Sequence, residues 1–340
     1  MEIKDLIIAV VLVIIGFVCL VKGADWFVDG AAGIAKKLRV PQLIIGLTIV
    51  SFGTSAPELA TSIISAFQGS ADIAVGNIIG SNITNILLIL GLSAIICPLV
   101  VQKSTLQIDF PVLLGSSALL LFFGAMDGKI DSTEGWIMFA ISMAYMILLI
   151  IYAVAESKKQ NPAETLQVDK IEGMEKAEPK TGLAGWFEKK KENVGFLFLL
   201  TLVGLVLVVI GALYGVIPGA TTLAEYFGVS EKVIGLTVVA IGTSLPELVT
   251  CVVASKKGET DIAVGDIVGS NIFNILRTLG LCSAIIPLTF EPTFLIDGLI
   301  ALAAAAFLAF CGYKNKKVGR LAGFVMLIAF AAYYVYLFAI

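Results

Sequence analysis

Two glutamates, Glu58 and Glu247, end nearly identical segments that lie 189 residues apart in the chain. The first segment reads GTSAPE over residues 53–58, and the second reads GTSLPE over residues 242–247. Both lie inside long apolar stretches, where an ionisable side chain is costly and usually marks the path of an ion or a substrate. A repeated segment of this kind predicts a transporter built from two halves around one central site.

The proline before each glutamate predicts a kinked helix, because Pro57 and Pro246 lack a backbone N–H and clash with the preceding turn. Carbonyl groups freed by a kink cannot stay unpaired in lipid, but they can bind a cation. The alternative is a purely structural kink that small residues pack and whose glutamate pairs with a lysine. Recurrence of the glutamate at the same place in both copies disfavours this alternative. Oxygen ligands are those that sodium and calcium prefer. The candidates are the carbonyls of Val50, Ser51, Val239 or Ala240, the hydroxyls of Thr54, Ser55, Thr243 and Ser244, and the carboxylates of Glu58 and Glu247.

A second repeated element follows each glutamate, over residues 76–86 and 265–275. We expect it to supply further ligands, because two buried glutamates need partners, rather than only hydrogen bonds between helices. Asn82 and Asn271 are interpreted as contacts that hold two helices together, since they lie off the ligand-bearing face. That face is formed in each copy by three polar residues spaced by four positions: Asn77, Ser81 and Asn85 in the first copy, and Asp266, Ser270 and Asn274 in the second.

The composition predicts an all-α integral membrane protein. Hydrophobic residues make up 58% of the 340 residues and charged residues 14%, and the mean hydropathy is +0.99. Apolar stretches of about 20 residues, enough for a helix to cross a ~30 Å hydrocarbon core, recur along the chain. The absence of histidine excludes imidazole metal ligands and histidine-based catalytic triads. We expect no enzymatic activity, no cofactor, no nucleic-acid partner and no protein partner.

We predict ten membrane-spanning helices in two groups of five, which occupy residues 1–154 and 194–340. The polar residues 155–193 between them, rich in Lys and Glu, are predicted to form a flexible linker. The predicted spans are residues 6–35, 41–68, 71–97, 105–126 and 132–154 in the first group, and residues 194–226, 230–256, 260–286, 292–313 and 318–339 in the second.

The distribution of Lys and Arg predicts the orientation of these spans. Eighteen such residues fall on the side of the linker and three, Lys4, Lys129 and Lys232, fall on the other. Positively charged loops tend to stay in the cytoplasm. We therefore predict a protein of the cell membrane whose linker lies in the cytoplasm and whose two termini lie outside the cell. Because each group has an odd number of spans, the second group enters upside down, and the two glutamates reach the midplane from opposite sides.

Together the two repeated elements resemble the alpha-repeats of the sodium/calcium exchanger family, within the calcium/cation antiporters. The resemblance rests on GTS-x-PE followed by G-N/D-x-x-GSN-x-x-N. It implies ten helices as two inverted repeats, a central cluster of one calcium site and several sodium sites, and first and sixth helices that slide across the other eight. It assigns Glu58 and Glu247 as shared carboxylates, Thr54, Ser55, Thr243, Ser244 and the carbonyls of Ser51 and Ala240 as further ligands, Ser81 and Ser270 to sodium sites, and Asn85 and Asn274 to the centre.

Two positions set this chain apart from relatives or from its own first repeat. Asn274 stands where some relatives, including potassium-dependent ones, have Asp, which argues against dependence on potassium. Arg277 stands where the first repeat has Leu88. One interpretation has Arg277 point into the ion cluster, pair with Asp266 or one of the glutamates, and weaken calcium binding. The other has it snorkel to a membrane interface.

The implied function is a sodium-driven antiporter that moves calcium out of the cell. An antiporter of the same fold with altered selectivity, such as proton for calcium or a monovalent exchange, is the alternative that Arg277 keeps open. Proton/calcium relatives usually carry a different motif around the glutamate. A channel would also use an oxygen-rich midplane, but an internal inverted repeat is typical of alternating access within one chain.

Overall fold

The computed structural model is all-helical apart from four two-residue strands in the residues it describes, which are 3–38, 40–67, 71–159, 193–226 and 240–339. Within these ranges eight helices are long and apolar enough to cross a membrane, and two helices that meet at a 45° bend can form a ninth span. The predicted span 230–256 is described only from Ala240 onward, so it lies partly outside the described residues. The chain is a multi-pass membrane protein, and the full number of ten spans stays a prediction.

The first half of the chain alternates long α-helices with short π-helical segments, which are labelled η. In chain order its elements are α1 (Ile3–Leu38), α2 (Gln42–Ile45), η1 (Gly46–Val50), α3 (Ser51–Thr54), α4 (Ala56–Phe67), α5 (Ala71–Ile83), η2 (Thr84–Leu90), α6 (Gly91–Ile96), β1 (Leu99–Val100), η3 (Thr105–Asp109), α7 (Phe110–Asp127), β2 (Lys129–Ile130) and α8 (Ser132–Lys159).

The second half repeats much of this order. Its described elements are α11 (Val194–Ile210), η5 (Gly211–Val216), α12 (Ile217–Tyr226), α14 (Ala240–Thr243), α15 (Leu245–Lys257), α16 (Thr260–Phe273), η7 (Asn274–Leu279), α17 (Gly280–Ile285), β3 (Leu288–Thr289), α18 (Pro292–Asn315), β4 (Lys317–Val318) and α19 (Arg320–Ala339).

Two short antiparallel sheets join the halves reciprocally. Strand β1 of the first half pairs with β4 of the second, with Leu99 opposite Val318, and β2 pairs with β3, with Lys129 opposite Thr289. Since β1 and β3 each follow the second repeated element, and β2 and β4 each precede the last helix of their half, the pairing is that of two halves related by a two-fold axis.

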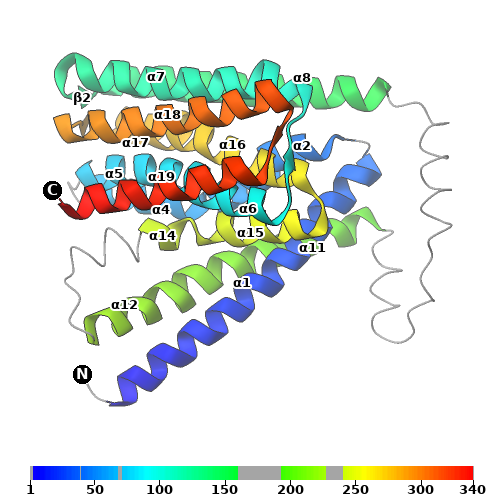
Figure 1. Ribbon diagram of the computed structural model, residues 1–340, viewed down its shortest axis with the longest axis horizontal. Coiled ribbons are helices and arrows are strands. Elements are labelled where there is room, and N and C mark those ends of the chain that lie inside the picture. Colours follow the sequence, from blue (N-terminus) through cyan, green and yellow to red (C-terminus); the bar gives the residue numbers. More distant parts are fainter. Residues whose placement is uncertain (1–2, 39, 68–70, 160–192, 227–239, 340) are drawn as a thin grey trace.

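The ends of the two halves point in opposite directions along the molecule. Helix α1 begins and helix α19 ends at the left of Figure 1, whereas α8 ends and α11 begins at the right. The first half therefore runs from left to right and the second from right to left. This antiparallel course agrees with an inverted repeat, although the domain boundaries at 154 and 194 and the identity of the cytoplasmic side stay predictions.

Helices α1 and α11 pack against each other and cross the stack of the other helices obliquely (Figure 1). Glycines let their backbones touch: a Cβ placed on Gly23 would lie 2.7 Å from the Gly204 carbonyl oxygen, and one on Gly30 would lie 2.8 Å from the Thr201 nitrogen. Small residues commonly bring membrane helices this close. The two helices therefore behave as one packed unit beside the rest of the protein.

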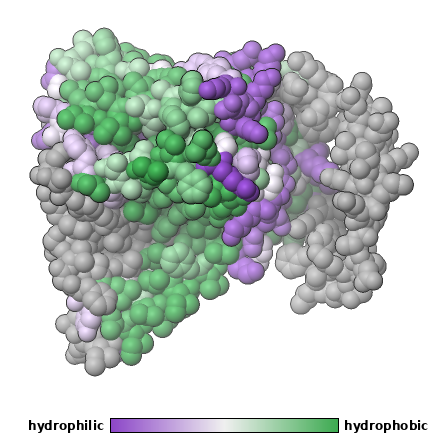
Figure 2. Space-filling view, in the orientation of Figure 1, coloured by the Kyte–Doolittle hydropathy of each residue, from purple (hydrophilic) through white to green (hydrophobic). Residues whose placement is uncertain are grey.

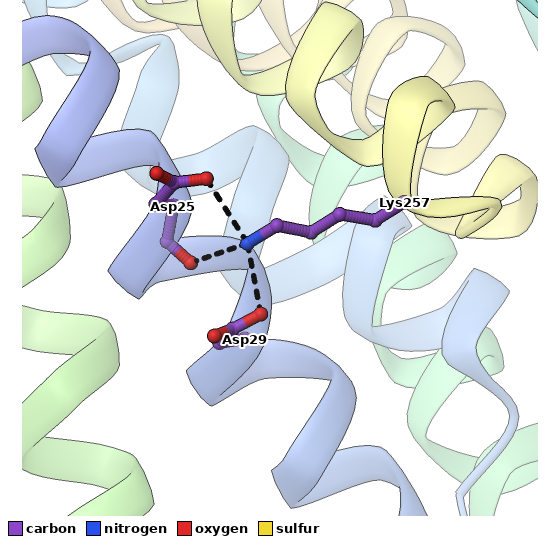
Figure 3. A network of polar contacts seen from close by, with 3 residues as sticks. All are labelled: Asp25, Asp29 and Lys257. Carbon is purple, nitrogen blue, oxygen red and sulfur yellow. Dashed lines mark hydrogen bonds and ion pairs between the residues drawn. The ribbon is translucent and has the colours of Figure 1, made fainter. Parts of the chain in front are cut away.

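An ion pair ties this unit to helix α15, which carries Glu247 in its first turn. In Figure 3, Lys257 reaches from the end of α15 to α1, where its Nζ lies 2.8 Å from Asp29 Oδ1 and 3.2 Å from Asp25 Oδ1. The same Nζ donates a hydrogen bond to the Asp25 backbone carbonyl at 2.9 Å. The contact thus connects the α1–α11 unit with a helix that shapes the candidate site.

The surface is suited to a bilayer. Figure 2 shows hydrophobic residues covering most of the described face, with hydrophilic residues gathered toward its right-hand part. Large apolar side chains such as Ile14 and Val18 of α1, and Ile328 and Val335 of α19, are exposed. Exposed apolar area on this scale is expected where lipid, rather than water, surrounds the protein.

Candidate functional site

Each GTS-x-PE segment breaks its helix at the second hydroxyl residue. Helix α3 ends at Thr54 and α4 begins at Ala56, and Ser55 between them has φ −80° and ψ 10°. In the second copy Ser244 has nearly the same geometry, φ −86° and ψ 5°, before Leu245 begins α15. The predicted kink is confirmed in the first copy by the 45° bend. In both copies the break turns the following glutamate inward.

The backbone carbonyls before the first break remain within the helix. The Ser51 carbonyl accepts the N–H of Ser55 at 3.2 Å, and the Val50 carbonyl oxygen lies 3.2 Å from the Thr54 hydroxyl oxygen. Each carbonyl keeps a second lone pair that a cation could use. In the second copy Ala240 begins α14, and Val239 lies outside the described residues.

The two repeats exchange serine–glutamate contacts. Ser55 donates its hydroxyl to Glu247 Oε1 at 3.0 Å, and Ser244 lies within hydrogen-bonding distance of Glu58 Oε1 at 3.2 Å. Ser244 Oγ is also 3.3 Å from Ser81 Oγ. Both glutamates are fully buried. Each carboxylate is therefore held by the opposite repeat, and the site belongs to both.

The threonines make the same exchange with the next repeated element. Thr54 donates to Asp266 Oδ1 at 2.9 Å, and Thr243 donates to Asn77 Oδ1 at 3.4 Å. Ser270 lies beside both Glu247 and Asp266. The predicted ligand-bearing faces of α5 and α16 are thus brought against the opposite kinked segments.

Five carboxylate and amide oxygens of this cluster have no hydrogen-bond partner among the described residues, and neither has the Ser270 hydroxyl, although buried polar atoms are normally paired. Carboxylate and amide oxygens are ligands for sodium and calcium, so five of them left free form the kind of lining that a cation requires. They belong to residues that are each less than 1% exposed: Glu58 Oε2, Glu247 Oε2, Asp266 Oδ2, Asn85 Oδ1 and Asn274 Oδ1.

The carboxylates do not form a metal centre by themselves. In the described part of the chain, no group of three or more Asp, Glu or Cys side chains is close enough to hold an ion. A cation here would have to combine carboxylate oxygens with hydroxyl, amide and carbonyl oxygens. Such mixed, weaker coordination suits an ion that must be released again.

Asn85 and Asn274, at the starts of η2 and η7, are bonded to asparagines of the opposite repeat. Asn274 Nδ2 donates to Asn82 Oδ1 at 3.2 Å, and Asn85 Nδ2 lies 3.4 Å from Asn271 Oδ1. Asn82 also donates its Nδ2 to the backbone carbonyl of Asn271 at 3.2 Å. Asn82 and Asn271 do bridge two helices, as predicted. Their contacts with the central asparagines were not anticipated, although the N-x-x-N spacing in both repeats could have suggested them.

Arg277 has surroundings that neither interpretation predicted. It is only 4% exposed, so it does not snorkel to a surface. Within the described residues it forms no ion pair and its guanidinium donates no hydrogen bond, so the proposed pairing with Asp266 or a glutamate is wrong. Its Cζ lies 4.2 Å from the centre of the Phe52 ring and 4.8 Å from that of Phe273. Aromatic faces stabilise the cation in place of a carboxylate.

Known proteins match the whole of this architecture. The family model described as "Sodium/calcium exchanger protein" matches residues 8–155 and 196–339. The chain is 36% identical to the "Putative antiporter CaxA" of Alkalimonas amylolytica, over 98% of this chain and all of that protein. It is 33% identical to the "Sodium/calcium exchanger MaX1" of Methanosarcina acetivorans, over 97% of this chain and 98% of that one. It is also 36% identical to the "Inner membrane protein YrbG" of Escherichia coli, over 94% of each.

A solved structure agrees with the fold. The sodium-calcium exchanger NCX_Mj, soaked with zero Na⁺ and Ca²⁺, superposes with a TM-score of 0.80 and 30% sequence identity, covering 98% of this chain and 99% of the other. The same protein soaked with 2.5 mM Na⁺ and 0.1 mM Ca²⁺ gives a TM-score of 0.79.

Proposed function

The chain belongs to the sodium/calcium exchanger protein family, and we propose that it exchanges sodium for calcium across the membrane at the buried site between its two repeats. Membership makes it a cation transporter rather than an enzyme. The finer assignment, sodium as the driving ion and calcium as the cargo, is the proposal. It also includes alternating access, in which the same site opens first to one side of the membrane and then to the other.

The observation that carries the proposal is the set of five buried oxygens without hydrogen-bond partners, three of which belong to carboxylates. Such a cluster is costly in a low-dielectric interior unless cations enter it. One calcium ion or several sodium ions can balance the same carboxylates, which makes the two ions competitors for one site. If more than two sodium ions replace each calcium ion, the exchange moves net charge.

The relatives support both ions. MaX1 is named a sodium/calcium exchanger, and the NCX_Mj crystals were soaked with Na⁺ and with Ca²⁺ or Sr²⁺. The second candidate is a same-fold antiporter with altered selectivity, such as proton for calcium or a monovalent exchange. The buried positive charge of Arg277, three residues beyond Asn274, is the observation that favours it, because a fixed cation near the site lowers its preference for a divalent ion.

We further propose that the protein lies in the cell membrane with residues 155–193 in the cytoplasm and both termini outside. The excess of Lys and Arg on that side supports this orientation. The relative YrbG is named an inner membrane protein.

Calcium uptake into proteoliposomes tests the proposed function. The purified protein is reconstituted with sodium inside and diluted into sodium-free buffer that contains radioactive calcium. We expect uptake with this outward sodium gradient and none with an outward potassium or proton gradient of the same size. Equal uptake with a proton gradient and no sodium would favour the second candidate. Uptake with no counter-ion gradient at all would favour a channel.

A further inference from the structure

We propose that Asn82 and Asn271 are positioning residues that fix the side-chain amides of Asn274 and Asn85, so that carbonyl oxygens and not NH₂ groups face the transported cation. This inference rests on the proposed function, since it assumes that a cation enters the cluster. It concerns residues outside the predicted ligand-bearing face.

The backbone carbonyl of Asn271 fixes the orientation of the Asn82 amide. The backbone carbonyl of Asn271 can only accept a hydrogen bond, so the atom of Asn82 that lies 3.2 Å from it must be the donor Nδ2. The other end of that amide, Asn82 Oδ1, therefore faces Asn274. An acceptor there requires a donor opposite it, and Asn274 supplies its Nδ2 at 3.2 Å.

The orientation of the central amide follows from this chain of contacts. With its Nδ2 tied to Asn82, Asn274 can only present its Oδ1 in the other direction, and this oxygen has no partner within the described residues. The first repeat is similar at its central residue: Asn85 Nδ2 lies 3.4 Å from Asn271 Oδ1, and Asn85 Oδ1 has no partner among the described residues. It differs in that Asn271 Nδ2 has no hydrogen-bond partner there, whereas Asn82 Nδ2 is anchored to a backbone carbonyl. All four side chains are buried, with Asn82 the most exposed at 4%.

Amide orientation matters for a cation because the two ends of the group have opposite character. The oxygen is a ligand for sodium and calcium, whereas the NH₂ end carries hydrogens and repels a cation. A carboxylate has an oxygen at both ends and needs no such fixing. An asparagine at the centre of the site therefore needs a neighbouring residue to orient its amide. An aspartate at the same place would not need one.

This contrast supplies the experiment, a double-mutant cycle between Asn82→Leu and Asn274→Asp. Calcium binding to the four purified proteins is measured by titration calorimetry in detergent. With Asn274 present, we expect Asn82→Leu to weaken calcium binding by about tenfold or more, because the freed amide can turn its NH₂ group toward the ion. In the Asn274→Asp background the same change should weaken binding by less than about threefold.

A matched control separates orientation from packing. Thr278→Val removes a fully buried hydroxyl from η7 that has no hydrogen-bond partner in the described structure. We expect it to leave calcium affinity unchanged in both backgrounds. Should Asn82→Leu fail to fold, Asn271→Leu combined with Asn85→Asp provides the equivalent cycle in the other repeat.

Equal weakening by Asn82→Leu in both backgrounds would make Asn82 a packing residue and overturn the inference, while leaving the proposed function intact. The inference would also be overturned if Asn82→Leu did not weaken calcium binding in the protein that retains Asn274. If the unaltered protein bound neither calcium nor sodium, the proposed function itself would fall, and the inference with it.

Discussion

Each of the two glutamates is held by a hydroxyl of the opposite repeat, and this exchange is the central feature at the residue scale. Ser55 contacts Glu247 and Ser244 contacts Glu58, so neither half can complete the site alone. One oxygen of each carboxylate remains without a hydrogen bond within the described chain. A bound ion would join the halves, because its ligands come from both.

Replacing either glutamate by glutamine tests this arrangement. Glu58→Gln and Glu247→Gln keep an oxygen for the serine contact but remove a negative charge from the site. We expect each to abolish sodium-dependent calcium uptake and to leave the ion-free protein at least as stable, because an unpaired buried carboxylate is costly. Calcium should raise the melting temperature of the unaltered protein and not that of the variants. Normal uptake by a correctly folded Glu247→Gln protein would remove that residue from the site.

Arg277 adds a fixed positive charge to the second repeat only. We expect Arg277→Leu, which restores the residue type of the first repeat, to raise apparent calcium affinity by about tenfold, for roughly 1.4 kcal/mol of repulsion removed. Arg277→Lys is the matched control: it keeps the charge but loses the planar contact with Phe52 and Phe273. Its calcium affinity should stay near that of the unaltered protein. Identical affinities for the Leu and Lys variants would show that the charge does not act on the site.

At the scale of elements, two features organise the protein: the kinked segments of the two repeats and the close packing of α1 against α11. The kinked segments hold candidate ligands against α5 and α16. The close contacts at Gly23 and Gly30, here called the glycine seam, hold α1 and α11 together. The Lys257 contact with Asp25 and Asp29 connects this pair of helices to α15. A sliding motion of the unit, which the family resemblance implies, would have to break or exchange that ion pair.

The glycine seam gives a prediction with a control in the same chain. Gly23→Ala would place a methyl group 2.7 Å from the Gly204 carbonyl oxygen and force the two helices apart. We expect a loss of about 1–3 kcal/mol in stability, as for overpacked cores, and slower exchange. Gly115→Ala on α7 meets nothing within 4 Å and should be neutral. Thermal unfolding in detergent and uptake rates compare the two, and equal effects would argue against a close seam.

Most features that occur in both repeats could be predicted from the sequence, whereas features that occur in only one repeat could not. The kinks at Pro57 and Pro246, the ligand-bearing faces of α5 and α16, and the helical membrane fold follow from repeated residue types and spacing. The surroundings of Arg277 could not be predicted, because both aromatic partners, Phe52 and Phe273, replace non-aromatic residues of the other repeat. The asparagine contacts were also missed, since a pattern of spacing does not reveal which atom of an amide faces which helix.

At the scale of the whole molecule, the two halves are joined at both ends by reciprocal sheets and run in opposite directions (Figure 1). Helix α8 ends and α11 begins at the same end of the molecule (Figure 1). The charge distribution predicts that this side is cytoplasmic. With this proposed orientation, the candidate site would lie between two similar halves that face opposite sides of the membrane, which is the arrangement that alternating access requires.

Cysteine labelling tests this orientation. In a background without the five native cysteines, a cysteine at Lys170, in the linker that lies outside the described residues, should resist a membrane-impermeant reagent added to whole cells. A cysteine at Lys129, the exposed first residue of β2 at the opposite end of the molecule (Figure 1), should react. Labelling of the Lys170 position and not of the Lys129 position would reverse the proposed topology while leaving the antiparallel course of the halves unchanged.

The central claim, one buried site that sodium and calcium share, is tested most directly by their competition for the purified protein. Calcium binding is titrated calorimetrically at a series of sodium concentrations, with ionic strength held constant by choline. We predict that the apparent Kd for calcium rises with sodium more steeply than in direct proportion, because several sodium ions displace one calcium ion. A calcium affinity that is independent of sodium, at concentrations where sodium itself binds, would contradict a shared site.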